Sequence, residues 1–142
     1  MKVFVDTGAW LALHDKQDQF HKQAVEARAR IEKEKIELVT SDFIFDESLT
    51  FIRYRTSHDS AVLFGSSLFH SSIVTMVSVD RDLLHMSFEL FRKYKDQDFS
   101  LTDCTSFVLM KRLKLTTCFT FDSHFSHMGF NLLEPLGVRF NF

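Results

Sequence analysis

The chain has 142 residues, of which 45% are hydrophobic and 25% charged, and its formal net charge is -2. This length predicts one domain over residues 1–142 with a single sizeable core. The near-neutral charge excludes a globally basic nucleic-acid-binding protein, so binding of that kind must depend on local patches or bound cations. The 17 phenylalanines exceed the needs of one small core, and we expect some of them in a subunit or partner interface.

Proline and glycine are scarce, with 1 and 4 copies, which argues against disorder and against an all-β fold rich in turns. The two cysteines, Cys104 and Cys118, are too few for a disulfide framework and favour a reducing compartment. No apolar stretch has the length of a signal peptide or a membrane span. We therefore expect a cytoplasmic protein without a membrane partner.

Short apolar runs alternate with amphipathic stretches along the chain. Strands that alternate with helices predict parallel pairing through right-handed crossovers, that is, a three-layer α/β/α sandwich with a mostly parallel central sheet. In chain order we expect a strand at 2–6, a helix at 8–14, a helix from Asp18 to about Lys35, a strand at 37–40, a helix that Ser41 or Asp42 caps, a helix at 59–71, a strand at 73–79, a helix that Asp80 caps, a helix that starts at Leu101, a strand at 117–121, and late edge strands at 131–134 and 138–142.

Four acidic residues occupy positions that such a fold brings together. Asp6 and Asp122 each end an apolar run, VFVD and CFTFD. Asp103 starts the helix before the second run, and Glu47 shares a helix face with large apolar side chains. Because sites in open parallel sheets form beyond the carboxyl ends of the strands, we expect these side chains to converge there.

Each acid alone also has a simpler explanation. An Asp after a strand is commonly a helix cap or a turn residue, and Asp103 could complement a helix dipole. Glu47 could form a salt bridge with Arg53 or another cation. Several converging carboxylates repel one another, however, and a divalent cation removes that conflict. Oxygen ligands suit Mg²⁺ or Mn²⁺, so the joint pattern predicts one or two such ions and hydrolysis of a phosphodiester.

Four stretches of the sequence also resemble a known family in their order and spacing. They are FVDTGAW, SDFIFDESLTFIRYR, FSLTDCTSFVLMKRLK and TCFTFDSHFSHMGFNLL, and together they span nearly the whole chain. In these stretches the chain resembles the PIN-domain ribonucleases, and in size and layout the VapC-like toxins of type II toxin–antitoxin modules. The resemblance implies a PIN-like fold, an Mg²⁺- or Mn²⁺-dependent endoribonuclease, a small antitoxin as partner, and a homodimer.

The resemblance also implies roles for individual residues. It assigns the metal-binding and catalytic positions to Asp6, Glu47, Asp103 and Asp122. Asp98 matches a less constant acidic position, for which Asp96 competes, and Thr7 and Thr102 are expected to support the neighbouring acids.

Two basic clusters lie near the ends of the helices that carry site acids. They are Arg53-Tyr54-Arg55 and Lys111-Arg112-Leu113-Lys114. Helix C-termini favour cations in any protein, so a structural role is the default for both. If the clusters flank the cleft, Arg53, Arg55, Lys111 and Arg112 would contact RNA phosphates. His124 could touch the substrate at the rim, whereas the His124/His127 pair lacks the companions of a zinc site.

Two other functions compete with the nuclease. A phosphoacceptor receiver module shares the architecture, but it would need paired acids after the first strand, where this chain has Asp6-Thr7-Gly8. A PIN-fold protein that binds or processes RNA outside a toxin–antitoxin system, with weak or no catalysis, would keep the same acids. Cleavage and phosphodonor assays separate these alternatives.

Overall fold

A computed structural model describes residues 1–134 of the chain. Within these residues, five parallel strands form one sheet in the order β3-β2-β1-β4-β5, which confirms the α/β prediction. The strands are β1 (Lys2–Val5), β2 (Glu37–Ser41), β3 (Val74–Val77), β4 (Thr117–Phe119) and β5 (Asn131–Leu132). The strand expected at 131–134 is shorter than predicted, and the one expected at 138–142 lies outside the described residues.

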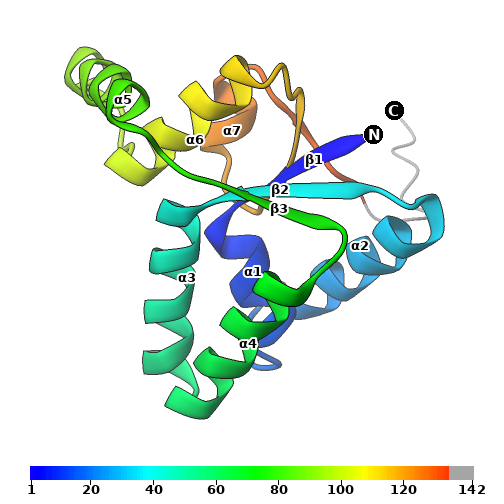
Figure 1. The fold of residues 1–142 in the computed structure, drawn as a ribbon. Helices are drawn as coiled ribbons and strands as arrows, with labels where there is room; N and C mark the ends of the chain where they lie inside the picture. Colours follow the sequence, from blue (N-terminus) through cyan, green and yellow to red (C-terminus); the bar gives the residue numbers. More distant parts are fainter. Residues whose placement is uncertain (135–142) are drawn as a thin grey trace.

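Helices cover both faces of this sheet (Figure 1). The connections from β1 to β2 and from β2 to β3 place α1 to α4 on one face, and the chain then crosses back so that α5 to α7 cover the other face. The helices are α1 (Thr7–His14), α2 (His21–Glu34), α3 (Asp42–Arg55), α4 (His58–His70), α5 (Arg81–Lys93), α6 (Leu101–Arg112) and α7 (His124–His127). None of them is long and apolar enough to cross a membrane.

The core forms where β1 packs between the two helical layers. Val3, Phe4 and Val5 are 0% exposed, and Phe107 and Phe119 are buried beside them. Burying a side chain of this size stabilises a fold by about 1.5–3 kcal/mol. The apolar run at the N-terminus is therefore the central strand, which fixes the position of the residue that follows it.

Side-chain caps set several helix starts as the sequence indicated. The Ser41 hydroxyl accepts from the Ile44 N–H, and the Asp80 carboxylate accepts from the Leu83 N–H. Asp18 was expected to cap the helix that runs to about Lys35, and this prediction was wrong. Asp18 accepts from the N–H of Phe20 in a turn, and α2 begins at His21.

The order of the strands produces one topological switch point. Connections leave β1 toward β2 and leave β4 toward β5, in opposite directions across the sheet. Crevices in parallel sheets open between two such strands, beyond their carboxyl ends. Asp6 directly follows β1 and Asp122 follows β4, so both acids lie at this point.

Candidate functional site

Asp6 lies where β1 turns into α1. Its carbonyl oxygen accepts hydrogen bonds from the N–H groups of Ala9 and Trp10, so its backbone begins the helix. Its side chain makes no capping hydrogen bond. Instead, the Thr120 hydroxyl donates to Oδ2 of Asp6 over 3.0 Å. The capping explanation therefore does not apply to this carboxylate, which is held toward the end of β4.

The Asp6 side chain is buried, with 6% of the residue exposed. Burial raises the pKa of Asp6 from 3.8 to about 7, and the charges of Asp103 and Asp122 add to this effect. Hydrogen bonds from the Thr120 hydroxyl and the Thr7 backbone act in the opposite direction. A carboxylate in this position needs either a proton or a cation near neutral pH.

Thr120 connects Asp6 to Asp122. Its Oγ1 accepts from the Asp122 N–H over 3.0 Å while its hydroxyl donates to Asp6. These two bonds fix the direction of the hydroxyl hydrogen. They also explain why β4 ends at Phe119 and not at Phe121 as predicted, because the backbone turns here to present Asp122.

Asp103 combines a structural task with a place in the site. Its Oδ2 accepts from the Ser100 N–H while the Ser100 hydroxyl accepts from the Asp103 N–H, which forms a capping box at the start of α6. Burial is the largest cause of the raised pKa of Asp103, and the Asp122 charge contributes to it. The cap therefore orients Asp103 but leaves its charge poorly solvated beside a second carboxylate.

His124, which was expected at the rim of the cleft, lies beside Asp103 and Asp122. Its Nδ1 is 3.3 Å from Oδ1 of Asp122 and 3.6 Å from Oδ2 of Asp103. This nitrogen is buried and has no hydrogen-bond partner within the described residues. One ligand atom from each of the three residues lies within 4.8 Å of the others, so this cluster could hold a metal ion. The signal in the sequence was the close spacing of Asp122 and His124.

Glu47 and two threonines complete the surroundings. Glu47 is half-buried in α3 and lines the same cleft as the three aspartates. Thr7 is buried in the first turn of α1, and its Oγ1 has no hydrogen-bond partner in residues 1–134. Thr102 lies in an adjoining hollow between α3 and α6, next to Glu47.

The four acids and Thr7 line one open cleft of about 490 Å³, which we call the acidic cleft. The structure thus brings together all four acids that the sequence singled out. The sequence reading missed Asp18, Phe20 and Phe121, which line the cleft from the turn before α2 and from the chain after β4. The lining residues are Asp6, Thr7, Gly8, Leu11, Asp18, Gln19, Phe20, Glu47, Arg55, Asp103, Phe121, Asp122 and Ser123.

Several predicted site residues lie away from the acidic cleft. Asp98 and Asp96 are exposed in the segment before α6 and do not line it. Lys111 and Arg112 end α6, about 12 Å or more along the helix from Asp103 at a rise of about 1.5 Å per residue. They line a hollow between α5 and α6 instead, where Arg112 contacts Asp80 at 3.0 Å.

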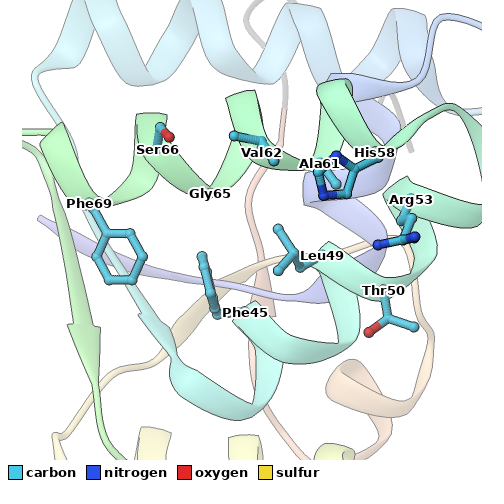
Figure 2. Close-up of a pocket in the computed structure, with 10 residues that line it drawn as sticks. All are labelled: Phe45, Leu49, Thr50, Arg53, His58, Ala61, Val62, Gly65, Ser66 and Phe69. Carbon is cyan, nitrogen blue, oxygen red and sulfur yellow. The ribbon is translucent and has the colours of Figure 1, made fainter.

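Arg53 lines a different hollow, the α3–α4 groove of about 440 Å³. Figure 2 shows Arg53 and His58 at one end of this groove and Phe69 at the other. Phe69 is 68% exposed. Of the cations expected to contact RNA, Arg55 alone shares the acidic cleft with the carboxylates, as judged from residues 1–134.

The donor set of the acidic cleft fits a divalent cation. Two carboxylates that follow β1 and β4 and two on α3 and α6 line one space, and oxygen ligands of this kind suit hard cations. Two further polar atoms, Oγ1 of Thr7 in the cleft and Nδ1 of His124 beside Asp122, have no hydrogen-bond partner within residues 1–134 and could contact the cation or its water. Asp6, Asp103, Asp122 and Glu47 are the side chains that could hold it.

Comparisons with known proteins agree with this geometry. The family model described as the PIN domain matches residues 3–131. The chain is 29% identical over 133 residues to VapC20 of Mycobacterium tuberculosis, a 23S rRNA-specific endonuclease, and the match covers 94% of this chain and 98% of that relative. The crystal structure of VapC20, described as a sarcin–ricin loop cleaving toxin, superposes with a TM-score of 0.84 at 28% identity and covers 94% of this chain and 99% of that one.

Two further solved structures share the fold at lower identity. VapBC2 from Rickettsia felis, bound to a DNA fragment from its promoter, gives a TM-score of 0.68 at 12% identity and covers 93% of this chain and 97% of that one. FitAcB from Neisseria gonorrhoeae gives 0.67 at 14% identity and covers 97% and 100%. At these identities the likeness concerns the fold alone.

Proposed function

Because this chain belongs to the PIN-domain family, we propose that it is a metal-dependent endoribonuclease that acts as the toxin of a toxin–antitoxin pair. The observation that carries the proposal is the convergence of Asp6, Glu47, Asp103 and Asp122 on one cleft at the switch point of the sheet. The similarity to VapC20 over nearly the full length of both chains supports the same activity.

The cofactor we propose is Mg²⁺ or Mn²⁺, as one or two ions held by Asp6, Asp103, Asp122 and Glu47. When bound there, the cation supplies positive charge for the phosphate and lowers the pKa of the attacking water. Thr120 holds Oδ2 of Asp6 in place, and the Ser100 cap holds Asp103, so two carboxylates are oriented before substrate arrives. Thr7 and Thr102 are proposed to orient the neighbouring acids, and the exposed Asp98 at most assists from outside the cleft.

The proposed substrate is a structured RNA, by analogy with the ribosomal RNA that the name of VapC20 specifies. The first test incubates purified protein with a hairpin of the 23S rRNA sarcin–ricin loop sequence in Mg²⁺ or Mn²⁺. We expect Asp6→Asn and Asp103→Asn to lower cleavage at least about a hundredfold, since they remove charge that holds the cation. Equal cleavage by wild type and both variants would contradict the proposal.

A binding measurement checks the metal independently of activity. A cation that binds only the folded state at a hundred times its Kd stabilises that state by about 2.7 kcal/mol. We therefore expect millimolar Mn²⁺ to raise the Tm of wild type by several degrees and that of Asp103→Asn by much less. Unchanged melting across the Mn²⁺ series would argue against the site, and RNA binding without cleavage would favour a non-catalytic PIN-fold protein.

We also propose that the whole chain works as one domain in the cytoplasm, as a homodimer, with a small antitoxin as partner. Both cysteines are free and buried, as expected in a reducing compartment. Phe88 and Phe91 are exposed three residues apart on α5, and this apolar pair supports association with another chain, because apolar surface of this kind is uncommon on monomers. Sedimentation of the purified protein tests the dimer, and copurification with the product of the adjacent reading frame tests the antitoxin.

A further inference from the structure

Arg55, the last residue of α3, lies in the acidic cleft together with several carboxylates. Within residues 1–134, it is the only Lys or Arg that lines the acidic cleft, which also contains Asp18 and the four site acids. A strand of RNA that enters this cleft brings further negative charge. We propose that Arg55 binds an RNA phosphate next to the one that is cut, an inference that rests on the nuclease function proposed above.

The contact that Arg55 makes without RNA leaves most of its donors available. One Nη1–H of Arg55 donates to Oδ2 of Asp18 over 3.3 Å, and residues 1–134 provide no other hydrogen bond to its guanidinium. A guanidinium carries five N–H donors in a planar fork that matches phosphate oxygens in pairs. Arg55 can therefore bind a phosphate in two-point geometry by giving up one long hydrogen bond.

Asp18 is the fixed member of this pair. Its side chain is 12% exposed, and its Oδ1 accepts from the Phe20 N–H over 2.8 Å. The Arg55 side chain is 45% exposed, and its guanidinium carbon lies 5.7 Å from the centre of the Phe51 ring. The turn before α2 thus holds the carboxylate in place, while the guanidinium rests on an aromatic ring at the solvent boundary of the cleft.

Helix geometry separates Arg55 from its neighbour Arg53. Residues two apart on an α-helix point about 200° away from each other. Arg53 accordingly lines the α3–α4 groove, whereas Arg55 lines the acidic cleft. The two arginines have the same charge and nearly the same place in the sequence, but only one of them faces the proposed metal ligands.

The wall beside Arg55 also suits a nucleotide. The rings of Phe20 and Phe121 are parallel within 3° with centres 4.7 Å apart, and both line the cleft. Aromatic surface next to a cation is the combination with which proteins bind unpaired nucleotides. A free phosphate ion has no base that could pack on these rings. A strand of RNA has both phosphates and bases, so it is the ligand that this wall fits best.

A purely structural role for Arg55 makes a different prediction. A cation at the end of α3 favours the helix dipole and neutralises Asp18. If that were its whole task, Arg55→Ala would change stability but not the salt dependence of RNA binding. Each phosphate contact on a single strand contributes about 0.7 to the slope of log K against log salt concentration, so this slope separates the two roles.

The experiment measures fluorescence anisotropy of a labelled hairpin with the sarcin–ricin loop sequence over a KCl series. All proteins carry Asp6→Asn, so the RNA stays intact in Mg²⁺. They also carry Asp18→Asn, which prevents an unpaired carboxylate from repelling RNA once Arg55 is changed. We expect Arg55→Ala to weaken binding about tenfold or more and to lower the salt slope by about 0.7.

Two further variants make this result specific. Arg55→Lys should keep the salt slope but recover only part of the affinity, since an ammonium is a point charge without the fork. Arg92→Ala is the matched control, because it removes the same charge and an ion pair with Glu89 on α5, outside the acidic cleft. Its affinity and slope should match those of the parent.

An unchanged slope for Arg55→Ala, or a loss seen with Arg53→Ala in its place, would overturn the inference. Absence of any RNA binding by the parent would overturn it too. Cleavage is measured separately in proteins with Asp6 intact. A protein that binds RNA through Arg55 without cutting it would support the contact between Arg55 and an RNA phosphate but contradict the proposed nuclease function. Normal cleavage in Arg55→Ala, with unchanged KM and kcat, would support the nuclease function but contradict the contact.

Discussion

The acidic cleft and the α3–α4 groove share helix α3, but each leaves a different kind of group in an unfavourable place. In the cleft, charged groups are buried: Asp6 is 6% exposed beside two other aspartates. In the groove, an apolar group is exposed: Phe69 is 68% exposed at its end (Figure 2). Carboxylates that lose water need a cation or a proton, whereas exposed apolar surface needs only to be covered. The first cost depends on pH and metal, and the second should depend on neither.

The largest expected effect is the pH dependence of stability in metal-free protein. The folded pKa of Asp6, about 7, lies above the ordinary value of 3.8. The folded state therefore binds the proton more tightly, and stability from this group falls as pH rises from about 4 to about 7. A shift of this size corresponds to a loss on the order of 4 kcal/mol across that window.

Urea unfolding of wild type and Asp6→Asn in EDTA, at a series of pH values, measures this term. Asn keeps the shape but cannot ionise, so the gap between the two proteins should widen in favour of the variant up to about pH 7. Asp59→Asn, a change at an exposed residue in the first turn of α4, serves as the control. A constant gap between wild type and Asp6→Asn would contradict the pKa shift.

A smaller effect is expected from Thr120→Val, which removes the hydroxyl that joins Asp6 to Asp122 while keeping the size of the side chain. Groups that orient metal ligands typically change metal affinity 10–100-fold when they are removed. We expect Mn²⁺ affinity, measured by calorimetry, to fall about tenfold. Thr120→Ser should retain most of it, and equal loss in the Ser and Val variants would show that packing, not the hydroxyl, matters here.

The sequence indicated the convergence of the acids because strand ends are local features. Asp6 and Asp122 each follow an apolar run, and parallel strands end at the same edge of a sheet. The sequence pattern therefore predicted that the two side chains lie close together. Glu47 was identified as a half-hidden acid on an apolar helix face. These inferences needed only periodicity and topology.

Other parts of the site depended on tertiary detail that periodicity does not encode. Both basic clusters lie at the ends of helices that carry site acids. Lys111, however, lies at the end of α6 that is far from the cleft. Arg55 lines the cleft because of the orientation of α3 about its own axis in the fold. The contribution of Thr120 depends on a turn after Phe119, where a longer strand was predicted. Asp18 looked like a helix cap, and only the fold places it opposite Arg55.

The smallest expected effect concerns the α3–α4 groove. It tests whether the cost of exposed apolar surface there is independent of the metal bound in the acidic cleft. Phe69→Ser removes an exposed ring that contacts Phe45 with ring centres 5.1 Å apart. A substitution at a surface position such as this one usually changes stability by no more than about 0.5 kcal/mol. The change should be the same in EDTA and in Mn²⁺, because Phe69 does not line the acidic cleft. Urea unfolding under these two conditions measures it. A Phe69→Ser effect that varies with Mn²⁺ would mean that the groove and the cleft are energetically coupled through α3, and the two hollows would then have to be treated as one site.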